Sequence, residues 1–349
     1  MRRIFKLVSK PLIGLDVSAS SLKWVELAQD DKAGLVLEHC VMEPLQVGWM
    51  AADHIAQFDE VVAALRRLVK ASGSQTRQVA LAMPDSAVSV SKIRLPADLG
   101  EAELLRQVEA EVERLSGRPW ADMHVDYSVQ GRPQAPSQGA EVEVWIAAAA
   151  NEKVQDRLGL AEAAGLEAVI LDVAAEAAML AARRLIPARQ SAPTHPVMAL
   201  IQVDTEGWSL HVTYQGAVVH ATRQPLHNAD RHQFQEALPV AYAPAVITLS
   251  PLLTSFILRL ADHLASALDG FLSTAPHRKI DTILLAGGSP WLAVLQQALK
   301  QRTFSDCLLV DAFSGMRVNQ VSQNAACHAG GRSSMLTACG LALRRFHGA

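Results

Sequence analysis

The strongest constraint on the fold is a local pattern that occurs twice. A short apolar segment ends in an aspartate and is followed by a polar turn and a second apolar segment. The first copy occupies residues 13–27, with its first strand ending at Asp16. The second copy starts at residue 199, with its first strand ending at Asp204. Each copy predicts a β-hairpin. When the two aspartates are aligned, the turns and second strands align as well. We therefore predict a duplicated α/β domain, and two unrelated aspartate-ended strands are the alternative.

Length and composition are compatible with a duplication. The chain has 349 residues, which is more than one compact core usually holds. Half of the residues are apolar, so large cores can form. A proline-rich stretch at residues 187–197 is the best linker in the chain. We place the first domain at residues 1–186 and the second at residues 198–349.

Charge and motif content exclude several function classes. The 35 acidic and 32 basic side chains nearly balance, so no overall field attracts nucleic acid or an anionic membrane. The four cysteines lack CxxC spacing and the histidines form no HExxH pair, which favours buried thiols over disulfides or a zinc site. Residues 238–258 carry no charge but contain three prolines. We predict a buried helix starting at Pro251 and capped by Ser250, rather than a membrane span.

Hydrophobic periodicity predicts the remaining elements. The expected helices lie at residues 58–71, 101–115, 151–164, 174–185 and 251–272. The expected strands, besides the two hairpins, lie at residues 79–83, 88–95, 125–129, 142–148 and 168–171.

A third feature follows the predicted strand at residues 282–286. Gly287 and Gly288 form a turn, and we predict Ser289 as the N-cap and Pro290 as the first residue of the next helix. Two glycines let a planar ligand approach the backbone, and a helix start offers free N–H groups. Simple close packing of strand and helix is the alternative explanation.

Two aspartate hairpins and a Gly-Gly turn form the layout of the actin and sugar-kinase superfamily, in which a nucleotide lies between two domains. Within that superfamily, four segments resemble the family of type IV pilus assembly protein PilM, of which the chain looks like a divergent member. These segments are IGLDVSASSLKWVEL at residues 13–27, ILLAGGSPWLAVL at 283–295, VDAFSGMRVN at 310–319 and LTACGLALRRF at 336–346. The resemblance extends over essentially the whole chain.

The resemblance implies an actin-like (ribonuclease H-like) duplicated fold. It also implies an inserted subdomain like that of the cell-division protein FtsA, at about residues 86–164, and a last helix that packs back on the first domain. Family members are cytoplasmic scaffolds of type IV pilus biogenesis and twitching motility. They lie at the inner membrane, where they bind the N-terminal cytoplasmic tail of the membrane protein PilN, and other pilus inner-membrane or motor components are further expected partners. The alternatives are an active ATPase or phosphotransferase, and a scaffold of a type II secretion or DNA-uptake system.

The resemblance also implies a nucleotide site whose residues come from three of these segments: Asp16, Ser18, Ser20, Lys23, Asp204, Gly287, Gly288 and Ser289. In this site the two aspartates would lie near a metal, the serines and the lysine would line the phosphate pocket, and the Gly-Gly-Ser turn would flank adenine and ribose. We therefore expect ATP and Mg²⁺ as ligands and at most weak ATPase activity. For the partner tail, the expected contacts are in the inserted subdomain: Val88, Val90, Ile93 and Leu95.

The chain departs from the family pattern at two places. Glu206 stands where the family has glycine in the second phosphate turn, which adds bulk and negative charge. The region from residue 215 to 279 is short, and His227, Asn228, Asp230 and Arg231 stand where a ribose-binding segment would begin. We therefore expect a reduced fourth subdomain. Trp208 would either stack on a base or cover a strand edge.

Overall fold

The structure is a computed structural model that describes residues 11–30, 34–51, 54–131, 139–185, 196–205, 207–215, 217–226, 250–275, 279–319 and 331–346. The predicted linker lies almost wholly outside these ranges. Glu206 also lies outside the described residues, as do the residues expected to begin a ribose-binding segment: His227, Asn228, Asp230 and Arg231.

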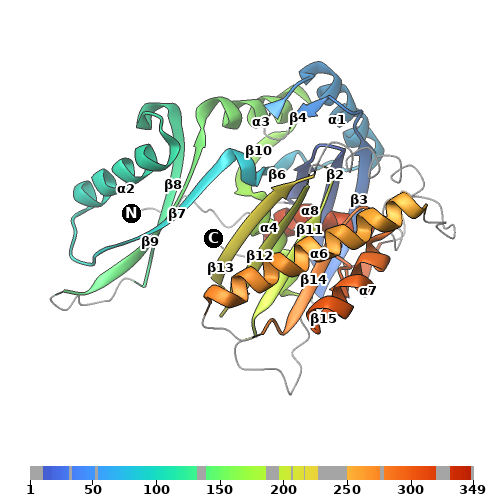
Figure 1. Cartoon of the computed structure of the whole chain (residues 1–349). Coiled ribbons are helices and arrows are strands. Elements are labelled where there is room, and N and C mark those ends of the chain that lie inside the picture. Colours follow the sequence, from blue (N-terminus) through green and yellow to red (C-terminus); the bar gives the residue numbers. More distant parts are fainter. Residues whose placement is uncertain are drawn as a thin grey trace.

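Two sheets with the same strand order form the body of the protein (Figure 1). The six-stranded sheet contains, in spatial order, β10 (Glu167–Val173), β6 (Gln78–Met83), β1 (Ile13–Val17), β2 (Ser21–Asp30), β3 (Gly34–Pro44) and β16 (Arg317–Val318). In the corresponding direction, the five-stranded sheet contains β15 (Asp306–Leu309), β14 (Thr282–Gly287), β11 (Met198–Val203), β12 (Gly207–Tyr214) and β13 (Ala217–Pro225). These five strands match β10, β6, β1, β2 and β3 of the first sheet in turn.

The pairing directions also match between the sheets. In each sheet the aspartate hairpin is antiparallel, its second strand pairs antiparallel with the third, and two further strands pair parallel on the other side. An unrelated pair of hairpins would not reproduce the whole order. The duplicated actin-like α/β fold is therefore confirmed.

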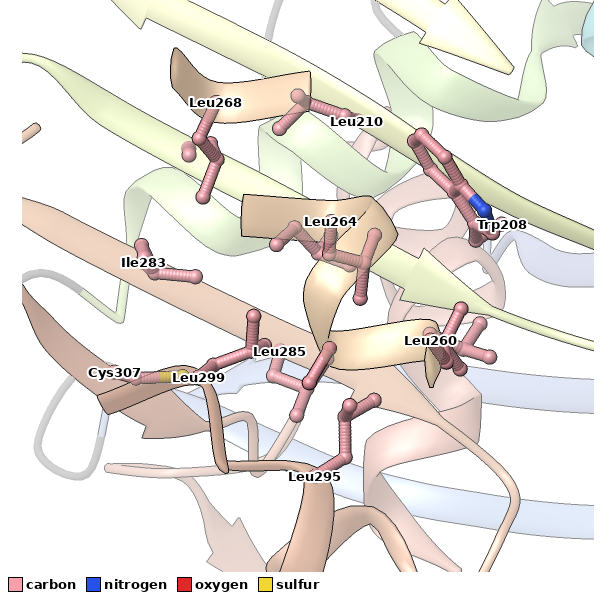
Figure 2. Close-up of a cluster of buried hydrophobic side chains, with 14 of the residues drawn as sticks. Trp208, Leu210, Leu260, Leu264, Leu268, Ile283, Leu285, Leu295, Leu299 and Cys307 are labelled. Atoms are coloured by element: carbon pink, nitrogen blue, oxygen red, sulfur yellow. The ribbon is translucent and has the colours of Figure 1, made fainter. Parts of the chain in front are cut away.

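Helices cover both faces of each sheet because their apolar residues recur at helical spacing. Helices α4 (Ala174–Arg183) and α8 (Leu336–Leu343) share one core with both sheets, so they lie between them. On its other face the first sheet is covered by α1 (Phe58–Ser72) and α3 (Asn151–Ala163). The second sheet is covered by α6 (Pro251–Thr274) and α7 (Leu292–Thr303). Figure 2 shows leucines of α6 meeting leucines of the sheet and of α7 in this last core.

A separate three-stranded sheet projects from the body (Figure 1). Its order is β7 (Val88–Pro96), β9 (Glu141–Ala150), β8 (Met123–Gln130), and α2 (Glu101–Ser116) packs on one face through Leu104, Val108 and Val112. This unit corresponds to the expected insertion but is shorter. Leu160 and Ala161 of α3 are buried in the core of the first sheet instead. We therefore propose residues 88–150 as the inserted subdomain, in place of 86–164.

Smaller elements complete the description: β4 (Met50–Ala51), β5 (His54–Ile55) and single 3-10 turns at Asp85–Ala87, Trp120–Asp122 and Arg332–Met335. Cys307 and Cys339 are free and buried, as the sequence predicts. Cys40 departs from that prediction because it is disulfide-bonded.

Candidate functional site

A cleft of about 570 Å³ lies where the two aspartate turns face each other. Its walls come from both sheets, from α3 and α4, and from the start of α8. Seven of the eight residues expected at the nucleotide line this cleft: Asp16, Ser18, Ser20, Lys23, Asp204, Gly287 and Gly288. Ser289 does not.

The first wall is a compact polar network at the β1–β2 turn. Asp16 and Lys23 are opposite each other in the antiparallel register, so their side chains leave the same face. Lys23 Nζ donates to Asp16 Oδ2 at 2.8 Å and to Ser18 Oγ at 3.1 Å. Asp16 and Lys23 are 9% and 8% exposed. The positive charge of this wall is therefore held in place by a nearly buried ion pair.

The second wall is built differently. Asp204 Oδ1 accepts from the backbone N–H of Gly207 at 2.9 Å, which closes the turn between β11 and β12. The Asp204 side chain is 54% exposed, and its Oδ2 lies 4.0 Å from Nη2 of Arg223 on β13. A Cβ at Gly207 would lie 2.2 Å from the carbonyl oxygen of Gln224, so the close β12–β13 contact requires glycine.

The Gly-Gly turn closes the cleft beside β14. A Cβ at Gly287 would lie 2.5 Å from the carbonyl oxygen of Val203. The close approach of the β14 end to β11 therefore requires glycine at this position. The backbone N–H of Gly287 donates to Ser333 Oγ at 3.2 Å.

The predicted helix start is wrong at this turn. Helix α7 begins at Leu292, and the backbone N–H of that residue donates to the carbonyl of Ser289. Pro290 and Trp291 extend the turn, so Ser289 does not cap the helix. Ser289 is 4% exposed, and its Oγ has no hydrogen-bond partner in the part of the chain that the structure describes.

Two cationic cleft residues were not predicted from the sequence. Arg157 on α3 is 2% exposed, and its Nη1 donates to the carbonyl of Val17 at 3.1 Å, directly before the β1–β2 turn. Arg223 comes from the third strand of the second sheet. Neither arginine belongs to a motif, and only the tertiary fold brings them to the aspartate turns. With Lys23, they give the cleft three cationic side chains.

The cleft residues fit a nucleoside polyphosphate and its metal. Hydroxyls and cations are the groups that bind phosphate oxygens, and glycine at 287 keeps the backbone accessible. Among the described residues, no group of three or more His, Cys, Asp or Glu could hold a metal ion alone. Mg²⁺ in nucleotide sites commonly takes one or two carboxylates and otherwise phosphate oxygens and water. Asp16 and Asp204 meet that requirement.

Trp208 covers the end of the second core. Its side chain is 6% exposed and packs with leucines of α6, with the indole nitrogen at the edge of the cluster (Figure 2). Further along β12, burial lowers the pKa of His211; nearby Asp85 opposes this shift, whereas His220 and Arg223 add to it.

The inserted subdomain presents an open sheet face on the side away from α2. Strand β7 alternates, so Ile93 and Leu95 point toward α2 and belong to its core. Leu95 is buried there and Ile93 is partly buried, so neither of these two expected partner contacts lies on the open face. Val88 packs against Met83 and Val154, whereas Val90 is 56% exposed on the open face.

This open face is joined to the second sheet. Lys92 lies two residues beyond Val90 and therefore on the same face. Its Nζ lies 3.9 Å from the ring centroid of Trp145 and donates to the carbonyl of Val218 on β13 at 2.9 Å. Residues from the insertion and from β13 thus border one exposed surface around Val90.

Within the described ranges, no helix combines the length and apolar character needed to cross a membrane.

Comparison with known proteins identifies relatives along nearly the whole chain. A family model described as "Type IV pilus assembly protein PilM" matches residues 14–346. A solved structure described as "PilM-PilN type IV pilus biogenesis complex" is similar with a TM-score of 0.75 and 21% identity, covering 96% of this chain and 98% of that one. The ethanolamine utilization protein EutJ from Carboxydothermus hydrogenoformans is similar with a TM-score of 0.51 and 10% identity, covering 96% and 89%.

Proposed function

The chain belongs to the family of type IV pilus assembly protein PilM, and from this premise we propose that it is a scaffold that binds the N-terminal cytoplasmic tail of an inner-membrane PilN-like protein. The observation that carries the proposal is the exposed surface around Val90, between the inserted sheet and β13. The related structure of a PilM-PilN complex supports this choice of partner.

An extended tail suits the surface around Val90. Strand β7 pairs only with β9 among the described strands, so its other edge carries backbone groups that a peptide strand can pair with. Val90 supplies an apolar contact, and the half-buried Trp145, with Lys92 over its ring, lies on the same face. The proposal locates the scaffold at the cytoplasmic face of the inner membrane, held there by its partner.

The cleft supports ATP as a second ligand. The carboxylate of Asp16 is already paired with Lys23, so it is poorly placed to activate a water, and slow turnover at most is expected. Strand β13 connects the two sites, because Val218 accepts from Lys92 of the insertion and Arg223 lines the cleft. We therefore propose that bound ATP modulates tail binding by shifting β13.

The test is calorimetric titration of the purified chain with a synthetic peptide of the PilN-like tail. Val90→Asp places a charge on the proposed contact surface and should weaken binding about tenfold or more. Val294→Asp is the matched control, because Val294 is also an exposed valine but lies on α7. Equal affinity of both variants and the wild type would place the tail elsewhere. No binding to the wild type would exclude this partner.

A further inference from the structure

Lys23 on the first sheet and Arg223 on the second both line the cleft, and each pairs with an aspartate. The two ion pairs differ in strength. Lys23 is nearly buried and lies 2.8 Å from Asp16. The side chain of Arg223 is 31% exposed, and its Nη2 lies 4.0 Å from the 54% exposed carboxylate of Asp204. Exposed ion pairs at such a distance contribute little to stability, because water screens them and the long side chain loses freedom. Arg223 can therefore leave Asp204 at small cost, whereas Lys23 cannot easily leave Asp16.

The position of Arg223 follows from the strand register. Arg223 is opposite Ser209 in the β12–β13 pairing, and both residues line the cleft. The guanidinium thus reaches the cleft from the second sheet, while Lys23 reaches it from the first. A polyphosphate between the two aspartate turns would meet one cation from each wall.

The chemistry of the two groups is also different. A guanidinium stays charged at any physiological pH and binds two phosphate oxygens at once, whereas an ammonium acts as a point charge. A terminal phosphate carries more charge and more acceptor oxygens than one carboxylate. It is therefore the better partner for Arg223 when both are within reach.

We propose that Arg223 moves from Asp204 to the terminal phosphate of a bound nucleoside triphosphate and so selects triphosphates over monophosphates. The proposal rests on the nucleotide cleft of the proposed function. Transfer of Arg223 takes its positive charge away from Asp204 Oδ2, which favours the approach of the divalent cation that accompanies the nucleotide, while Oδ1 still accepts from the Gly207 N–H. It also draws the second sheet toward the first, because the phosphate then bridges Arg223 and Lys23.

The test compares the affinities of ATP, ADP and AMP, each with Mg²⁺, by calorimetry on the full chain. Arg223→Gln removes the charge and should weaken ATP binding about 10- to 100-fold, ADP less, and AMP not at all. Arg223→Lys should give an intermediate loss. Arg317→Gln is the matched control, because Arg317 also pairs with an aspartate, Asp30 at 3.3 Å, but does not line the cleft.

Three outcomes would overturn the proposal. Unchanged ATP affinity in Arg223→Gln would mean that the guanidinium stays on Asp204. Equal losses for ATP and AMP would mean a structural role, and circular dichroism of the variant identifies misfolding. If the wild type binds no nucleotide, the cleft role fails, while binding of the PilN-like tail remains a separate result.

Discussion

Replacing Gly340 by alanine tests the packing on which both sites depend. Gly340 lies in α8, at the contact with α4 between the two sheets. A Cβ at this position would lie 1.7 Å from the carbonyl oxygen of Ala177 and 2.4 Å from its carbonyl carbon. Both are backbone atoms of α4, so no side-chain rotation relieves the overlap. The two helices must move apart by more than about 1 Å before the atoms reach an ordinary contact distance.

The expected cost follows from that separation. A gap of about 0.5–1 Å removes a quarter to a half of the dispersion energy of each contact across it. Overpacking of a core costs about 1–3 kcal/mol and occasionally more. The clash at Gly340 is backbone against backbone, so we expect the upper end, about 3 kcal/mol, which exceeds the gain of about 1 kcal/mol for alanine in a helix. The net loss is then about 2 kcal/mol, and the corresponding fall in Tm is roughly 4–8 °C for a domain of this size.

Thermal unfolding followed by circular dichroism measures this effect. Gly270→Ala is the matched control, because Gly270 also lies inside a helix, α6, and a Cβ there meets no atom within 4 Å. Its Tm should stay equal or rise slightly, since alanine is the better helix former. If Gly340→Ala unfolds within 2 °C of the wild type, the close contact between α8 and α4 is refuted.

Three further predictions concern buried polar and titratable groups. Lys23→Met should lower the free energy of unfolding by about 3 kcal/mol, because it leaves the buried Asp16 carboxylate unpaired; urea denaturation measures it. The lowered pKa of His211 means that the unfolded chain binds its proton more readily than the folded chain. The contribution of His211 to stability should therefore be full above about pH 6.5 and be lost below it, so the free energy of unfolding should fall less on acidification in His211→Gln than in the wild type. Burial raises the pKa of Cys307 to about 11 and of Cys339 to about 12, so iodoacetamide at pH 8 should alkylate neither in the folded protein, as read by mass spectrometry.

Each of these predictions has a result that contradicts it. A Lys23→Met variant as stable as Lys279→Met, in which an exposed lysine is lost, would mean that the Asp16 pair contributes nothing. An identical pH profile in His211→Gln would assign the acid sensitivity to other groups. Rapid alkylation of Cys307 or Cys339 would show that their cores open in the folded state.

Local sequence patterns predict most of the fold because each element carries its own signal. The helix that begins at Glu101 has Leu104, Val108 and Val112 on one face, and Gly117 ends it in a left-handed conformation. Observed helix and strand ends therefore lie within a few residues of those predicted. Several strands were not predicted, among them the long strands β3 and β13. Strand β15 was also missed, because it is a short segment whose two leucines are partly exposed.

The candidate site was only partly predictable. The aspartate turns and the glycines lie on motifs, but Arg157 and Arg223 reach the cleft from elements that carry no motif. Alternation along β7 identifies two faces, yet only the position of α2 decides that Leu95 is core and Val90 is exposed. Ser289 looked like a helix cap because serine followed by proline is the usual start, but Trp291 prolongs the turn.

Photo-cross-linking in cells tests the central claim most directly. A photoreactive phenylalanine analogue at position 90 should cross-link to the N-terminal tail of the PilN-like membrane protein, identified by mass spectrometry. The same analogue at position 294, on α7, should give no such product. Cross-links to that tail from position 90 alone are the result that a docking scaffold predicts. Absence of the product at position 90, or equal yield at position 294, would contradict a partner surface between the inserted sheet and β13.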